Sequence, residues 1–148
     1  MKKIMFEDLQ IKIDQHAAYL SGAADGIRLD LQGYDLFGYD LSGVDMKDAQ
    51  MTNAVLKRTI LWNINLEGAV LTGVNFKHSV MDGAILKNCR LEGASFKGVN
   101  LENADLRGAN LTNADMEDVS LRNAAYDQNT ILPQGFDPVS AGMRFFEE

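Results

Sequence analysis

The sequence has one cysteine, two histidines and two prolines among 148 residues, and this scarcity argues against several classes of protein. A single cysteine, Cys89, rules out an internal disulfide framework and fits a reducing compartment. His16 and His78 have no metal-ligand spacing to each other or to the cysteine. No run approaches the ~18 apolar residues of a membrane helix, and charges follow Met1 too soon for a signal peptide. We therefore expect a one-domain cytoplasmic protein without a membrane contact.

Acidic residues outnumber basic ones, and the formal net charge is -7. This balance disfavours direct binding to nucleic acid, which needs Lys and Arg to neutralise phosphates. A Gly-rich phosphate loop is also missing, because the glycines recur on a regular spacing instead. No pocket is expected to perturb the many carboxylates. We predict no catalytic, metal or cofactor site, and hence no enzyme.

The feature that is present is a period of five. From Leu31 to Leu121 every fifth residue is Leu, Met or Phe, at 19 consecutive positions that we call the repeat centres. Neither an α-helix nor a long alternating strand gives this spacing. Two positions before each centre lies a second residue that is usually small. Two positions after it, 17 of 19 residues are Gly, Asn or Asp, which tolerate tight turns and positive φ.

This spacing predicts a stack of square coils. Residues two apart in an extended segment share a face, so each centre and the small residue before it point inward. The turn residue bends the chain, and four bends close one coil of about 20 residues. Stacked coils pair their backbones at ~4.8 Å, so 19 repeats give ~4.75 coils and a rod of roughly 23 Å.

The pattern resembles the pentapeptide-repeat family, whose motif is A(D/N)LXX. Clean copies are Ala104–Gly108, Ala109–Asn113 and Ala114–Asp118. The resemblance covers about residues 28–125, which we take as the repeat domain. It implies an all-β fold, a right-handed quadrilateral β-helix; the handedness comes from the family and not from the spacing.

The two ends are predicted to cover the open edges of the β-helix. Residues 1–27 should form a helix over Phe6–Leu20 and a loop. A short helix with a histidine and an aromatic residue is similar to the cap of many bacterial family members, and His16 and Tyr19 take those places. Residues 126–148 form either an irregular cap or, as in some family members, a homodimer contact, so a monomer and a C-terminal homodimer both stay open. The apolar residues of this tail are Phe136, Met143, Phe145 and Phe146.

The outward position just before each centre is usually Asp or Asn, but some of these positions are apolar. Ile60 and Val80 are 20 residues apart and should touch, and Trp62 follows Ile60 on the same outer side. We predict that Ile60, Trp62 and Val80 form an exposed apolar patch that marks a partner site. The alternative is a lone exposed aromatic beside residues with strand propensity. The apolar outward residues are Val55, Ile60, Val70, Val80 and Ile85.

One face should also carry a column of lysines that ends in an acidic cluster. Arg58 and His78 flank this column. Its members are Lys57, Lys77 and Lys97, followed by Asp115, Glu117 and Asp118.

We interpret the protein as a scaffold that binds another protein. The alternative comes from the family, some of whose members modulate type II topoisomerases by imitating acidic duplex DNA. Against this, the repeat region has 13 acidic and 10 basic residues. An inert module of a larger assembly is a third possibility. The outward acids of the first coil should ring it rather than form one stripe; they are Asp30, Asp35, Asp40 and Asp45.

Overall fold

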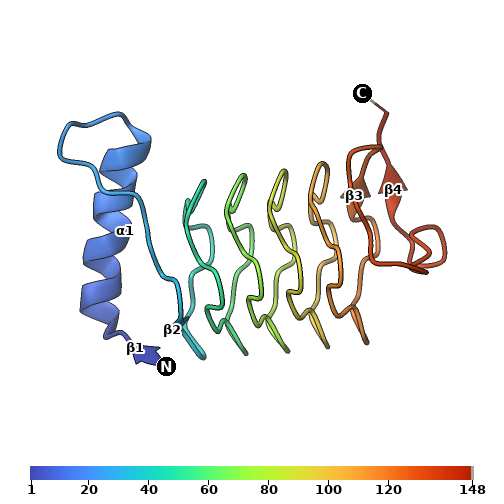
Figure 1. The fold of residues 1–148 in the computed structure, drawn as a ribbon, viewed down its shortest axis with the longest axis horizontal. Helices are drawn as coiled ribbons and strands as arrows, with labels where there is room; N and C mark the ends of the chain where they lie inside the picture. The colour runs from blue at the N-terminus through green and yellow to red at the C-terminus, as the bar shows by residue number, and fades with distance from the viewer. Residues whose placement is uncertain (148) are drawn as a thin grey trace.

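The computed structural model describes residues 1–147 and shows a stack of similar coils with one helix at its N-terminal end (Figure 1). Five short elements lie at the two ends of the stack. They are β1 (Lys2–Lys3), α1 (Phe6–Leu20), β2 (Tyr34–Asp35), β3 (Ala125–Tyr126) and β4 (Arg144–Phe145). Between β2 and β3 the coils follow one another along the long axis of the molecule, from green to orange in Figure 1.

Parallel backbone bridges join each coil to the next at a separation of 20 residues. Ile60, for example, pairs with Asp40 on one side and with Val80 on the other. The Leu61 N–H donates to the Val80 carbonyl at 2.8 Å. Each straight segment contributes one bridge residue before the chain turns again, so the coils are joined by isolated bridges instead of long strands. The predicted 20-residue coil is confirmed by this register.

The turns explain the choice of residues at every fifth position. All 19 turn positions from Gly33 to Asn123 have positive φ, a conformation that glycine adopts freely and that Asn and Asp tolerate best among the other residues. The residue before each centre has a role that we did not foresee. Where it is Asp or Asn, its Oδ1 accepts a hydrogen bond from the N–H two residues later, as from Asn75 to Lys77 at 3.0 Å.

The interior of the stack is filled by the repeat centres and the small residues beside them. The large centres are buried, and the rings of Phe76 and Phe96 stack at 5.2 Å between centroids. Burying one such side chain contributes about 1.5–3 kcal/mol, so the repeated centres supply most of the driving force for folding. The column ends less tightly, because Met116 is only half-buried.

Helix α1 lies at the N-terminal end of the stack and has the predicted bounds, Phe6–Leu20. Its buried residues are Leu9 and His16. The His16 ring is fully buried: its Nδ1 accepts from the Leu29 N–H at 2.9 Å, and its Nε2 lies 2.9 Å from the Lys47 carbonyl. These partners define a neutral imidazole with its proton on Nε2. His16 thereby ties the helix to the first coil.

Strand β1 was not predicted. Lys2 pairs with Tyr34 and Lys3 with Asp35, in parallel register with β2. The Lys3 ammonium also forms an ion pair with the Asp35 carboxylate. The first residues therefore extend the coil stack by a short edge before the chain enters α1.

The tail is less irregular than predicted, because it continues the pairing of the stack. Strand β4 pairs in parallel with β3, and Ile131 pairs with Asn110. Asp127 anchors the first tail turn: it is buried, and its Oδ1 accepts from the Gly108 N–H at 3.1 Å. The repeat pattern stops at residue 125, but the coil register continues into the tail.

Candidate protein-binding surface

The single cysteine is part of the core. Cys89 is buried, and its Sγ–H donates to the Leu66 carbonyl at 2.8 Å. Burial raises the pKa of the Cys89 thiol to about 12. A thiol of this kind has too little thiolate to act as a nucleophile at neutral pH. Cys89 therefore fills a small inward position of the repeat.

No other chemistry-bearing cluster stands out in the part of the chain that the structure describes. Within residues 1–147, no group of three or more His, Cys, Asp or Glu side chains is placed to hold a metal ion. Over the same residues, no helix is both long and apolar enough to cross a membrane.

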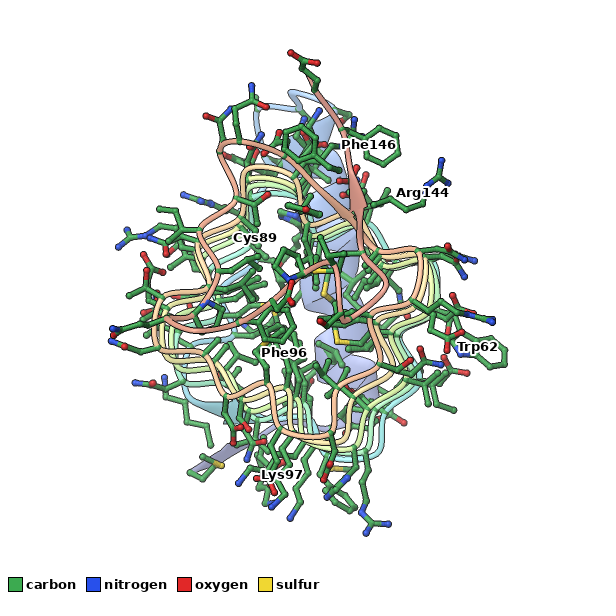
Figure 2. The ribbon with its side chains drawn as sticks, turned by 90° about the vertical axis from the view of Figure 1, so that its right-hand side faces the viewer. Trp62, Cys89, Phe96, Lys97, Arg144 and Phe146 are labelled. Carbon is green, nitrogen blue, oxygen red and sulfur yellow. The ribbon has the colours of Figure 1, made fainter. Side chains whose placement is uncertain are left out.

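The structure places Ile60, Trp62 and Val80 on the same side of the stack. Ile60 and Val80 are bridge partners in adjacent coils. Ile60 is 37% exposed and Val80 is half-buried. Trp62 is 54% exposed, and its ring points away from the coils (Figure 2). We call these three residues the apolar patch.

The sequence gives up a hydrogen bond to make this patch. At ordinary repeats the Asp or Asn before the centre accepts from the N–H two residues later, as Asp40 does from Ser42 at 3.0 Å. Ile60 and Val80 occupy the equivalent positions of the next two coils and have no acceptor to offer. A hydrogen bond of this type contributes about 0.5–1.5 kcal/mol, so apolar side chains here do not serve the stability of the turn.

A shallow groove beside Trp62 was not predicted from the sequence. The Asn103 Nδ2–H donates to the Asp82 Oδ1 at 3.0 Å and closes one end of the groove. The signal for it lies in the 20-residue spacing of Asn63, Gly83 and Asn103, which places all three at one corner of the stack. Its lining residues are Trp62, Asn63, Asp82, Gly83 and Asn103.

The predicted lysine column runs along the neighbouring side of the stack, where Lys97 projects downward in Figure 2. The Lys97 ammonium lies 3.2 Å from the Glu117 carboxylate in the next coil. The hydrogen bond and charge of Glu117 raise the pKa of Lys97. The acidic end of this column thus neutralises its last lysine but is one coil too far to reach Lys77.

The predicted dimer contact splits into buried and exposed residues. Met143 is buried and Phe136 is half-buried against the core, so both contact their own chain. Phe145 packs edge-to-face on Tyr126 at 5.4 Å between centroids but stays mostly exposed. Phe146 lies under the guanidinium of Arg144 at 5.4 Å, on the outer side of β4 (Figure 2). Of the four tail residues, only the last two aromatics offer a free surface.

The acids of the first coil lie on four different sides of the stack. Each pairs with a different residue of the next coil, and none of these four partners is acidic. The first-coil acids are Asp30, Asp35, Asp40 and Asp45, and their partners are Gln50, Val55, Ile60 and Asn65. A DNA duplex carries its charge continuously along its length, whereas these carboxylates do not continue from coil to coil.

The chain is similar to several solved structures, among them pentapeptide repeat proteins and a quinolone-resistance protein. A pentapeptide repeat protein from the thylakoid lumen of Arabidopsis thaliana is 31% identical over 62% of this chain and 67% of that chain, with a TM-score of 0.53. The pentapeptide repeat protein Rfr23 from the cyanobacterium Cyanothece 51142 is 30% identical over 72% and 90%, with a TM-score of 0.42. QnrB1, a plasmid-mediated fluoroquinolone resistance protein, is 16% identical over 79% and 82%, with a TM-score of 0.37.

No curated protein matches the chain. Residues 49–88 and 84–123 match the family of pentapeptide repeats, with eight copies of the repeat. Together these ranges span half of the chain. The solved relatives imply a right-handed β-helix, which agrees with the parallel 20-residue register of the coils. The protein therefore belongs to the pentapeptide repeat family.

Proposed function

We propose that this protein is a non-enzymatic scaffold that binds another protein through the apolar patch of Ile60, Trp62 and Val80. The observation that carries the proposal is the exposure of Trp62 beside two β-branched residues that replace turn-capping acids. Exposed apolar clusters of this kind mark interaction sites in soluble proteins. Aromatic residues, tryptophan above all, supply much of the binding energy at protein interfaces.

A site-specific crosslink tests this proposal directly. We would replace Trp62 by the photoreactive residue p-benzoylphenylalanine, irradiate the source cells and identify the captured peptide by mass spectrometry. Phe37 offers the matched control, because it is an aromatic residue with 56% exposure outside the patch. One specific protein captured from position 62 and not from position 37 is the expected result. Capture of the same proteins from both positions would refute the patch as the binding site.

A substitution then separates binding from folding. Trp62→Glu places a charge where the side chain is more than half exposed, so the melting temperature should stay nearly unchanged. Binding of the captured protein should be lost. A large fall in melting temperature would show that Trp62 supports the core instead.

The same crosslinking experiment addresses the alternative, a DNA mimic that modulates a type II topoisomerase. A topoisomerase that binds native protein and Trp62→Glu equally would favour the mimic and count against the apolar patch. The distribution of the first-coil acids over four sides gives this alternative no continuous acidic stripe.

Dimerisation is a separate matter that concerns the tail. A homodimer through Phe145 and Phe146 remains a proposal, supported by their exposure next to the paired edge of β4. Sedimentation analysis of native protein and of the double variant F145S/F146S would detect it, since only a dimer through these rings would dissociate in the variant.

A further inference from the structure

Two turn residues break the rule that the other turns obey. Of the 19 turn positions, only Arg58 and His78 are neither Gly, Asn nor Asp. Both have positive φ, 57° and 60°. An arginine gains nothing from this conformation, which brings its Cβ close to the following carbonyl oxygen. Residues held in such conformations concentrate at functional sites.

These two residues belong to one corner of the stack. They are 20 residues apart, which is the separation between stacked positions in adjacent coils. The His78 ring lies over the next turn of the same corner, since a Cβ on Gly98 would come within 2.5 Å of its Nδ1. Both side chains are exposed, and both are basic residue types.

The two lysines beside this corner have no ion pair in the part of the chain that is described. Lys57 and Lys77 precede Arg58 and His78 and are half-buried along the face of the stack. No carboxylate of residues 1–147 lies within ion-pair distance of either ammonium. Stacked coils are only ~4.8 Å apart, so their like charges repel. Lys97, one coil further, is paired with Glu117.

This basic cluster adjoins the apolar patch on the same two coils. Arg58 is two residues before Ile60, and His78 is two residues before Val80. The residues between them, Thr59 and Ser79, are buried, so the chain passes from basic corner to apolar face without an intervening exposed residue. The column that contains Lys97 and the side that carries Trp62 meet at this corner in Figure 2.

We propose that Lys57, Arg58, Lys77 and His78 form the anion-binding half of one composite site, whose occupant is an acidic segment of a partner protein with an apolar side chain. The inference rests on the proposed function, because the apolar half of the site is the patch described above. Carboxylates of the segment neutralise the basic cluster, and its apolar side chain covers Ile60 and Trp62. Charge complementarity of this type selects a partner and speeds its encounter.

A short acidic segment fits this site better than a long polyanion does. The basic column ends after two unpaired lysines, and the next residues along it are Glu117 and the neighbouring Asp118. A nucleic acid laid along the column would meet these carboxylates, and the protein as a whole carries a net charge of -7. A phosphate backbone would also leave the apolar patch uncovered. The site accommodates a few carboxylates next to an apolar anchor.

A peptide selection tests the composite site even while the partner is unidentified. Native protein would be panned against a phage-displayed library of random dodecapeptides, in parallel with the charge-reversal variant K57E/K77E. The matched control is K47E/K87E, which changes the net charge equally at equivalent repeat positions on another face. Thermal melts would verify that all variants are folded, and K57Q/K77Q would replace K57E/K77E if the latter were unfolded.

We expect native protein and the control to enrich peptides that combine Asp or Glu with Trp, Phe or Leu. In a fluorescence polarisation assay with the most enriched peptide, K57E/K77E should bind about tenfold more weakly or worse, because two attractions become repulsions. Raising the salt concentration should weaken native binding as well. Enrichment without acidic residues, no enrichment at all, or an equal loss in the control would overturn the inference.

Two further arms separate this inference from the proposed function. Peptides that Trp62→Glu loses but K57E/K77E retains would overturn the basic half of the site and leave the scaffold proposal intact. Peptides that Trp62→Glu still binds would overturn the apolar patch as a binding site. A fluorescent single-stranded DNA dodecamer or phosphatidylserine vesicles that bind native protein more tightly than the peptide would identify a phosphate ligand and overturn the acidic segment.

Discussion

Replacing Arg58 by glycine is expected to make the protein more stable, although the change deletes a whole side chain. The φ angle of Arg58 is 57°, in the left-handed region. An L-residue other than Asn or Asp loses about 1–2 kcal/mol there relative to its ordinary conformations. Glycine avoids that cost but gains conformational entropy when unfolded, which returns about 0.5–1 kcal/mol. The net gain is therefore about 0.5–1 kcal/mol.

Urea unfolding measures this gain as a higher midpoint at unchanged slope. In a thermal melt, a chain of this length should rise by about 1–4 °C. The backbone hydrogen bond from the Arg58 N–H to the Lys77 carbonyl, 3.0 Å, is kept in the variant. Gly93→Ala provides the reverse control, because φ is 69° there and no atom lies within 4 Å of an added Cβ. That variant should lose about 1 kcal/mol through its backbone conformation alone.

A destabilised Arg58→Gly variant beside a destabilised Gly93→Ala variant would contradict this expectation. It would mean that the arginine side chain makes contacts worth more than the cost of its backbone conformation. If Arg58→Gly is more stable and also binds the selected peptide less tightly, the residue serves binding at the expense of stability.

Three further predictions concern single buried or half-buried groups. Cys89 should resist alkylation by iodoacetamide at pH 8 in native protein and react quickly in 6 M guanidinium, because burial raises its pKa to about 12; rapid labelling of folded protein would contradict its buried position. His16→Ala should lower the free energy of unfolding by roughly 2–5 kcal/mol, since it leaves a buried N–H and a carbonyl without their partner, and a loss below that of Tyr19→Ala in the same urea titration would contradict this. For Asp105, burial raises the pKa, but the hydrogen bonds and charge of Arg107 outweigh it and lower the pKa below the ordinary 3.8. Its carboxylate therefore stabilises the fold above that value and loses the contribution as the pH falls below it, so the stability gap between native protein and Asp105→Asn should shrink between pH 6 and pH 3; a constant gap would refute the assignment.

The regular part of the fold could be predicted because each repeat repeats the same local information. The centres from Leu31 to Leu121 specify which side chains enter the core, and the turn residues specify where the chain bends. The stacking of Ile60 on Val80 follows from that period alone and is confirmed by their bridge. The capping of turns by Asp and Asn was not foreseen, although those residues are part of the motif, because it depends on a side-chain hydrogen bond and not on periodicity.

The ends could not be predicted in the same way, since their partners are distant in sequence and occur once. Lys2 pairs with Tyr34, 32 residues away, and nothing in its local sequence indicates a strand. Asp127 has the sequence of an exposed turn residue but is buried as an acceptor for the Gly108 N–H. Met143 was open to interpretation as a dimer contact, and only the return of β4 onto β3 decides that it packs inside.

The composite site is the place where local preference and global fold disagree most. Along most of the stack, turn residue, capping residue and core residue all favour the same structure, as expected for a sequence that specifies one fold. At Arg58, Ile60, His78 and Val80 the chain departs from its own pattern twice in each of two adjacent coils. The first departure in each coil puts a basic residue at positive φ, and the second removes a turn-capping acceptor. Four departures at one corner have no structural benefit that the coils themselves provide, and sites that violate the rules of their own fold are where function is expected. The corner formed by these residues is therefore the part of the surface at which substitutions should affect binding more than stability.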